Sequence, residues 1–236
     1  MNESLSRSPV GTELLDDPSA DADTVESSLR DIAVANRWLG GTAAALHGLG
    51  RVLAGMPRGS RATLLDIGTG RGDLPRAAVG WGERRGIEIV PVALELNAVA
   101  AALALRAGIP TAVADAASPP VGPRSVDVVL LSQVAHHFSR DSVARLASTC
   151  DELARRGVVI ADLRRSAMAA VGFRIGARLL RFDPVTRLDG VTSVRRGFSP
   201  RELEALLRGS GISARVERRP GFRLVATWRT GADAYR

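Results

Sequence analysis

Short apolar runs alternate with helical segments through most of the chain, and this alternation restricts the fold more than any other feature of the sequence. Predicted strands cover 63–67, 87–94, 111–114, 126–132 and 157–161, and the helices between them cover 74–84, 98–107 and 142–154. Such alternation is typical of a mostly parallel sheet covered by helices. The sequence therefore predicts an α/β fold.

The two ends of the chain depart from this alternation. Residues 1–22 are rich in Ser, Asp, Pro and Glu, so we expect them to be loosely ordered. Helices are predicted over 24–37 and 42–53, separated by Gly40-Gly41.

The C-terminal part begins with an apolar helix predicted over 167–181, followed by a loop rich in Asp, Gly and Arg. The motif Ser199-Pro200-Arg201-Glu202 is a capping box with proline at the first helical position, so a further helix should start there. Two closing strands, 213–218 and 222–228, should then form a hairpin.

Composition narrows the class of protein. A chain of 236 residues predicts one domain. Cys150 is the only cysteine and there are three histidines, so we expect no internal disulfide and no metal site. No apolar run approaches the length of a membrane span or resembles a signal peptide, which favours a soluble, cytoplasmic protein.

The net charge of +7 raises the question of nucleic acid, but its distribution weakens that interpretation. All 32 basic residues are arginine and none is lysine, as a bias toward GC-rich codons would also produce. The N-terminal 31 residues carry a net charge of −6, whereas residues 151–236 carry +9. A solvated arginine-rich face and a site for an anionic partner both remain open.

A glycine turn between a strand and a helix is the strongest local signal. In Leu64-Leu65-Asp66-Ile67-Gly68-Thr69-Gly70-Arg71-Gly72-Asp73, glycines allow a sharp turn and close approach to a ligand. The third glycine comes one position too early for a dinucleotide fingerprint, and a Walker loop would need lysine. An acid at Asp66 suits a ligand with cationic groups.

Polar residues also follow the next three strands, at the edge where open α/β sheets bind ligands. Glu95 ends the second strand and could chelate two ribose hydroxyls, and Asp115 ends the third and could accept from an adenine amino group. Ser132-Gln133 ends the fourth. Asn97 either contacts the ligand or only caps a helix.

Together, Asp66-x-Gly68-x-Gly70-x-Gly72, Glu95, Asp115 and Ser132-Gln133 resemble the motifs of class I S-adenosylmethionine-dependent methyltransferases. The resemblance implies a Rossmann-like, seven-stranded, mostly parallel sheet with an antiparallel final hairpin. It also implies S-adenosylmethionine as cofactor and S-adenosylhomocysteine as product. The implied cofactor-binding residues are Asp66, Gly68, Thr69, Gly70, Gly72, Glu95, Leu96, Asn97, Asp115, Ala116, Ser132 and Gln133.

Two histidines follow the fourth strand, and an acid ends the fifth. His136, His137 and Asp162 resemble the base and its partner in small-molecule O-methyltransferases that act on sugar and polyketide hydroxyls. Because a phenol has a pKa near ~10, its methylation benefits from a general base. We therefore expect His136 to be the base, with Asp162 as its partner and His137 as the second candidate.

Flanking segments should cover the acceptor. We expect 1–22 as a tail, 23–62 as an N-terminal helical lid and 63–236 as the methyltransferase domain, in which 167–197 is a substrate cap inserted after the fifth strand. Arg37 could reach the cofactor carboxylate. The apolar candidates for the lid are Trp38, Leu39, Leu46, Met168, Val171, Phe173, Ile175, Leu179, Leu180 and Phe182.

These features predict methyl transfer to a hydroxyl group of a small hydrophobic phenolic or polyketide-like natural product. Three alternatives stay open: carbon methylation of a quinol-type ring, as in ubiquinone and menaquinone methyltransferases; RNA methylation; and cofactor binding without methyl transfer. An acidic N-terminus and scarce aromatics speak against RNA. The oligomeric state stays open, with a homodimer as one alternative.

Overall fold

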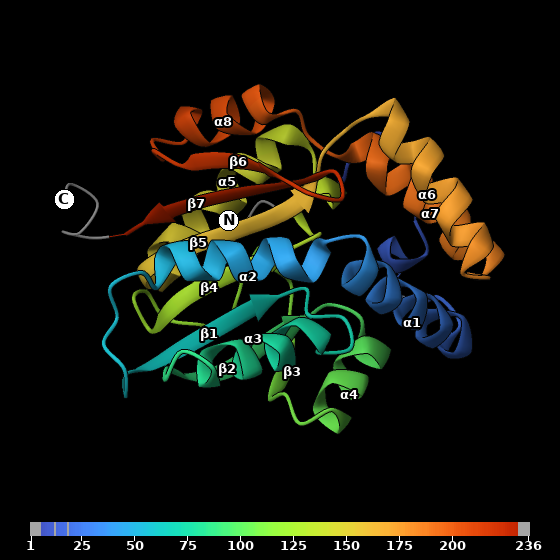
Figure 1. Ribbon diagram of the computed structural model, residues 1–236. Helices are drawn as coiled ribbons and strands as arrows, with labels where there is room; N and C mark the ends of the chain where they lie inside the picture. The colour runs from blue at the N-terminus through green and yellow to red at the C-terminus, as the bar shows by residue number, and fades with distance from the viewer. Residues whose placement is uncertain (1–5, 12, 18, 231–236) are drawn as a thin grey trace.

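The computed structural model describes residues 6–11, 13–17 and 19–230, and a single seven-stranded sheet organises them. The strand order is β3-β2-β1-β4-β5-β7-β6, and β7 runs antiparallel to both of its neighbours while the other pairs are parallel. The strands are β1 (Arg61–Ile67), β2 (Glu88–Glu95), β3 (Thr111–Val113), β4 (Val126–Ser132), β5 (Ala154–Leu163), β6 (Arg215–Arg219) and β7 (Arg223–Arg229). This topology confirms the predicted α/β fold with a reversed final hairpin (Figure 1).

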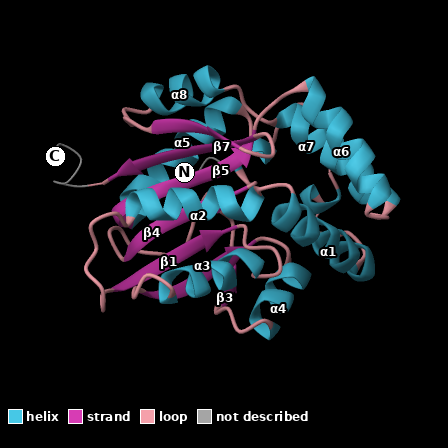
Figure 2. Ribbon diagram, viewed as in Figure 1, coloured by secondary structure: helices cyan, strands magenta, loops and turns pink. Residues whose placement is uncertain are grey.

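Helices cover both faces of the sheet (Figure 2). The helices α2 and α3 pack on one face, and α5 and α8 pack on the other. The carboxyl ends of β1, β4 and β5 point toward α1, α6 and α7 (Figure 1). The helices are α1 (Ala22–Trp38), α2 (Gly41–Val52), α3 (Asp73–Glu83), α4 (Ala98–Arg106), α5 (Arg140–Leu153), α6 (Ala167–Leu179), α7 (Pro184–Arg196) and α8 (Pro200–Gly209), with short 3-10 turns at Leu14–Asp16 and Ala135–His137.

Burial on both faces explains why the central strands are mostly apolar. Successive side chains of a strand point to opposite faces. In β1, Leu64 joins the core under α2 and α3, whereas Leu65 joins the core under α5 and α8. Close packing of α2 depends on Gly48, because a β-carbon there would lie 2.4 Å from Val159 Cγ1.

The predicted loop after α6 is wrong, because most of it forms the helix α7. The carboxylate of Asp183 accepts from the N–H of Val185, and Pro184 occupies the first turn. The many Arg, Asp and Gly residues of this segment give it no clear helical pattern of apolar residues. The helix α7 is stabilised by tertiary packing instead. Gly190 lies against α6 so closely that a β-carbon would be 2.0 Å from Phe173 Cε1.

The N-terminal segment 1–22, expected to be loosely ordered, makes defined contacts where it is described. Arg7 forms a β-bridge with Phe138, and Ser6 accepts a backbone hydrogen bond from Ser139. Residues 1–5, 12 and 18 of this segment, and 231–236 of the expected domain, lie outside the described residues. Within the described ranges, no helix is long and apolar enough to cross a membrane.

Candidate active site

The loop between β1 and α3 forms a cradle at the carboxyl edge of the sheet. Gly68, Gly70 and Gly72 have φ angles of +73°, +58° and +79°, which favour glycine. A β-carbon at Gly68 would lie 2.4 Å from Val134 Cγ2. The loop therefore requires glycine at these positions, because other residues would be strained or would clash.

Asp66 lies at the base of this cradle and is 1% exposed. Its Oδ1 and the hydroxyl of Thr69 are buried and have no hydrogen-bond partner among the described residues. Burial raises the pKa of Asp66 to about 7; the nearby Thr69 hydroxyl opposes this rise, and the charge of Glu95 adds a smaller contribution to it. Burying such atoms without partners costs about 1–3 kcal/mol each, so the pair indicates a site for a polar ligand.

Glu95 ends β2 opposite the glycine loop. Its Oε2 accepts from Gly70 N at 2.8 Å, and its Oε1 accepts from Asn97 N at 3.0 Å. Burial raises its pKa. Asn97 caps α4, because its Oδ1 accepts from the N–H groups of Val99 and Ala100.

At the centre of the site, Gln133 is held between two side chains. The residue has a φ of +58°, its Nε2 donates to Asn36 Oδ1, and its Oε1 accepts from Arg223 Nη1 at 2.7 Å. Burial lowers the pKa of Arg223 to about 10, against the opposing charge of Asp162. Arg37, the predicted contact to a carboxylate, is exposed and does not line this site.

Sequence reasoning missed Arg223 and Asn36. The signal for Arg223 was present, since it is an arginine at the start of a strand whose following residues are mostly apolar and buried. The sequence does not show which face of the sheet Arg223 lies on. Its place beside the cavity follows from the antiparallel pairing of β7 with β5.

His136 and Asp162 form a buried pair across the ends of β4 and β5. The distance from His136 Nδ1 to Asp162 Oδ1 is 2.7 Å, and His136 N donates to Asp162 Oδ2 at 3.2 Å. Burial raises the pKa of Asp162, but the charge and hydrogen bonds of His136 outweigh it and hold this pKa below its usual value. An ionised Asp162 requires a proton on Nδ1, so a neutral His136 keeps its lone pair on Nε2. This Nε2 is buried and has no partner in the described part of the chain.

His137 is engaged differently. Its Nδ1 lies 2.9 Å from Asp16 Oδ1, and its Nε2 lies 4.0 Å from Glu13 Oε2. Burial raises the pKa of Asp16, but hydrogen bonds from His137 and Arg196 outweigh it and hold the pKa well below its usual value. Glu13 accepts from the Ser193 hydroxyl at 2.7 Å. Sequence reasoning missed Glu13, Asp16 and Arg196, because their partners lie more than a hundred residues away.

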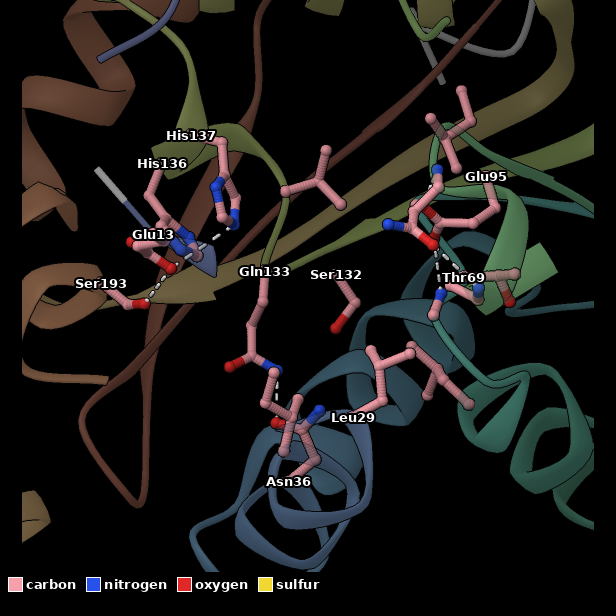
Figure 3. A pocket seen from close by; sticks show the side chains of 18 of the residues that line it. Glu13, Leu29, Asn36, Thr69, Glu95, Ser132, Gln133, His136, His137 and Ser193 are labelled. Carbon is pink, nitrogen blue, oxygen red and sulfur yellow. Dashed lines mark hydrogen bonds and ion pairs between the residues drawn. The ribbon is translucent and has the colours of Figure 1, made fainter. Parts of the chain in front are cut away.

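One cavity of about 240 Å³ joins the two groups of residues. Glu95 and Thr69 lie at one end, and His136, His137, Glu13 and Ser193 lie at the other, with Ser132 and Gln133 between (Figure 3). Of the residues predicted at the site, those that line this cavity are Asp66, Gly68, Thr69, Gly70, Glu95, Leu96, Asn97, Asp115, Ala116, Ser132, Gln133, His136 and His137. Gly72 and Asp162 do not line it; Gly72 shapes the turn and Asp162 lies behind His136.

The expected apolar lid is only partly correct. Phe173 lines the cavity, and Phe182 is buried in a separate cluster with Ala35 and Ala177. α7 contributes a mixed surface through Thr186, Asp189, Gly190, Ser193 and Val194. Leu39 and Leu46 are half-buried and pack against other clusters. The remaining candidates are exposed: Trp38, Met168, Val171, Ile175, Leu179 and Leu180.

Residues 65–161, which carry the glycine loop, Glu95 and both histidines, match the family described as a methyltransferase domain. The chain contains a methyltransferase domain. Among curated proteins, none matches the sequence significantly.

Solved structures share the fold of this chain at low sequence identity. An S-adenosylmethionine-dependent methyltransferase from Aquifex aeolicus is 16% identical with a TM-score of 0.58, and the match covers 88% of this chain and 97% of that one. Human N-acetylserotonin methyltransferase in complex with S-adenosylmethionine is 13% identical with a TM-score of 0.59, and the match covers 93% of this chain and 58% of that one. An O-methyltransferase from Planctomyces limnophilus in complex with apigenin is 17% identical with a TM-score of 0.57, and the match covers 87% of this chain and 62% of that one.

S-adenosylmethionine is the cofactor of this family, and the residues of the cavity fit it. The unpartnered Asp66 Oδ1 and Thr69 Oγ1 offer an acceptor and a hydroxyl to polar groups of a ligand. A β-carbon at Gly68 would close the cradle against Val134. The carboxylate of Glu95 lies at the same end of the cavity, where it could accept hydrogen bonds from the two hydroxyls of a ribose.

Proposed function

We propose that this methyltransferase transfers a methyl group to a hydroxyl of a small hydrophobic, phenolic or polyketide-like natural product, with His136 as general base. The observation that carries the proposal is the buried His136–Asp162 pair. His136 lines the same cavity as the glycine cradle, and its Nε2 has no hydrogen-bond partner in the described part of the chain. Substrate and cofactor would therefore meet beside the base.

The cofactor would be held by residues from four strand ends. Glu95 would bind the ribose hydroxyls, Asp115 and Ala116 would flank the adenine, and Asp66, Thr69 and Gln133 would face the methionine part. Bound S-adenosylmethionine supplies an electrophilic methyl group on a sulfonium. The cradle positions this group and excludes water, which converts transfer into a reaction between aligned neighbours.

His136 removes the proton that the acceptor hydroxyl must lose. A phenol with a pKa near ~10 is mostly protonated at neutral pH and is a weak nucleophile in that form. The proton would pass from the hydroxyl oxygen to His136 Nε2 as the oxygen–carbon bond forms and the sulfur–carbon bond breaks, with S-adenosylhomocysteine as the leaving group. Asp162 holds the ring through Nδ1 and stabilises the imidazolium that results.

The walls of the cavity support a small, mainly apolar acceptor. Leu29, Ile32, Phe173 and Val194 line it from α1, α6 and α7. We propose that 23–62 and 167–197 act as lid and cap over the domain formed by 63–236. A cavity of about 240 Å³ suits a small molecule better than a nucleic acid.

Calorimetry and mass spectrometry test the proposal. Wild-type protein should bind S-adenosylhomocysteine at micromolar concentration, and Glu95→Ala should lose that binding. With a panel of phenolic acceptors, His136→Gln should keep cofactor binding but lose about 10²–10⁴-fold in turnover. The matched control is His47→Gln, because His47 lies on α2 beside Glu217, away from the cavity.

Unchanged turnover in His136→Gln would contradict the base assignment. NMR of the product would locate the new methyl group. A methyl on carbon would favour the quinol-type alternative, and a methyl on oxygen supports the proposal.

A further inference from the structure

Buried polar atoms without partners gather in the cavity of the proposed active site. Seven buried side-chain nitrogen or oxygen atoms lack a hydrogen-bond partner in the described part of the chain, and five of them belong to residues that line this cavity. Asp66 and Thr69 account for the cofactor end. The other three are Glu13 Oε1, His136 Nε2 and Thr186 Oγ1, at the acceptor end.

Two of these three atoms, Glu13 Oε1 and His136 Nε2, are hydrogen-bond acceptors on residues that lie side by side. A carboxylate oxygen of Glu13 and a ring nitrogen of His136 lie within 4.8 Å of each other. Since Nδ1 of His136 donates to Asp162, its Nε2 is an acceptor when the ring is neutral. Glu13 Oε2 already takes the Ser193 hydroxyl, and Arg196 Nη1 lies 3.0 Å from Oε1 without the alignment of a hydrogen bond.

A single hydroxyl group cannot satisfy both acceptors, because it has only one proton to donate. A hydrogen bond between a hydroxyl and an acceptor spans about 2.5–3.0 Å. A carboxylate oxygen of Glu13 and a ring nitrogen of His136 lie within 4.8 Å of each other, so two hydroxyls on neighbouring atoms of one ring can reach both residues. Leaving either acceptor unpaired after water is excluded would cost binding, which makes the second hydroxyl a selected feature.

Resting on the proposed function, we propose that the acceptor is a ring with two adjacent hydroxyl groups. One hydroxyl donates to His136 and is methylated, and the other donates to Glu13, which selects and orients the ring.

The site depends on the N-terminal segment, which carries Glu13 to the cavity. Arg196 Nε donates to Val10 O at 2.7 Å, and its Nη2 donates to Gly11 O at 2.6 Å and to Asp16 Oδ2 at 2.8 Å. These bonds fix the segment against α7. Glu13 therefore faces the acceptor from an element that precedes the methyltransferase domain in the sequence.

Calorimetry on protein saturated with S-adenosylhomocysteine tests the proposal with two probes, 4-methylcatechol and 4-methylphenol. We expect the catechol to bind at least tenfold more tightly. Glu13→Gln should remove most of that preference and change phenol binding less than twofold. The control is Asp17→Asn, in the same segment but exposed, which should keep the preference.

The outcomes separate the two proposals. If the wild-type protein does not bind S-adenosylhomocysteine, the proposed function itself is contradicted. With that binding intact, three results would overturn the diol proposal: no catechol binding at millimolar concentration, equal affinity for the two probes, or a preference that survives Glu13→Gln. Micromolar Zn²⁺ binding that Glu13→Gln abolishes would also overturn it, by assigning Glu13 and the histidines to a metal.

Discussion

Gly68 adopts a φ of +73°, and a β-carbon there would lie 2.4 Å from Val134 Cγ2. Gly68→Ala should therefore weaken S-adenosylhomocysteine binding at least tenfold and lower the free energy of unfolding by about 2–4 kcal/mol, since strain and overpacking add. Calorimetry and urea unfolding measure the two effects. Gly55→Ala is the matched control, because Gly55 has a φ of +86° but open space around it.

The control should lose about 1–2 kcal/mol of stability from backbone strain alone and should bind the cofactor product normally. Equal cofactor affinity in Gly68→Ala and Gly55→Ala would show that the clash with Val134 does not matter for the cradle.

Asp66 makes the stability of the cofactor-free protein depend on pH. Burial raises its pKa to about 7, above the unfolded value near ~3.9. The contribution of Asp66 to stability is thus fully present below about pH 4 and is lost as pH rises through 7. Relative to Asp66→Asn, the wild type should lose about 3 kcal/mol of unfolding free energy between pH 5 and pH 8.

Urea unfolding of both proteins at several pH values measures this difference. Glu13 titrates in both proteins, so its contribution cancels in the comparison, and that of Glu95 cancels except for its interaction with Asp66. A difference that is flat or rises with pH would mean that Asp66 is not held in the environment described.

At the scale of elements, α7 and the N-terminal segment depend on each other through Arg196, which is 1% exposed. Arg196→Met should release residues 6–17 from α7, because it removes the bonds to Val10, Gly11 and Asp16 and leaves buried acids uncompensated. Hydrogen exchange should show about tenfold or greater loss of protection in the segment. The acceptor KM should rise while S-adenosylhomocysteine affinity stays within twofold.

Arg195→Met is the matched control, since Arg195 is the neighbouring residue of α7 but is exposed. It should change neither measurement. Protection of residues 6–17 that persists in Arg196→Met would contradict the anchoring role of Arg196.

At the scale of the whole molecule, the proposed cofactor site joins the ends of four strands and α1 across one cavity. Ligand binding to the folded state alone, at one hundred times Kd, adds about 2.7 kcal/mol of stability. For a chain of this size, S-adenosylhomocysteine should raise Tm by about 5–10 °C. Differential scanning fluorimetry measures the shift, which Glu95→Ala should remove.

A wild-type protein whose Tm is insensitive to S-adenosylhomocysteine would argue against the site. So would an equal shift in Glu95→Ala, since the ligand would then be bound elsewhere.

The sheet, and the residues that gather around the glycine loop at one end of the cavity, could be predicted from the sequence because they depend on local rules. Alternating apolar runs specify strands that are buried on both faces, and the carboxyl ends of parallel strands meet at one edge. Asp66, Glu95 and Ser132 each follow or end such a strand, so their positions along the chain determine where they gather. The capping box at Ser199 likewise predicted the start of α8, and the structure confirms both of its hydrogen bonds.

Only the tertiary structure decided what faces the acceptor. α7 has no strong helical pattern and is stabilised by packing against α6. Arg223 reaches the cavity through the antiparallel pairing of β7, and Glu13 reaches it because Arg196, more than 180 residues later, holds its segment. Neither composition nor spacing encodes such contacts, since they arise where segments distant in sequence bury charge together.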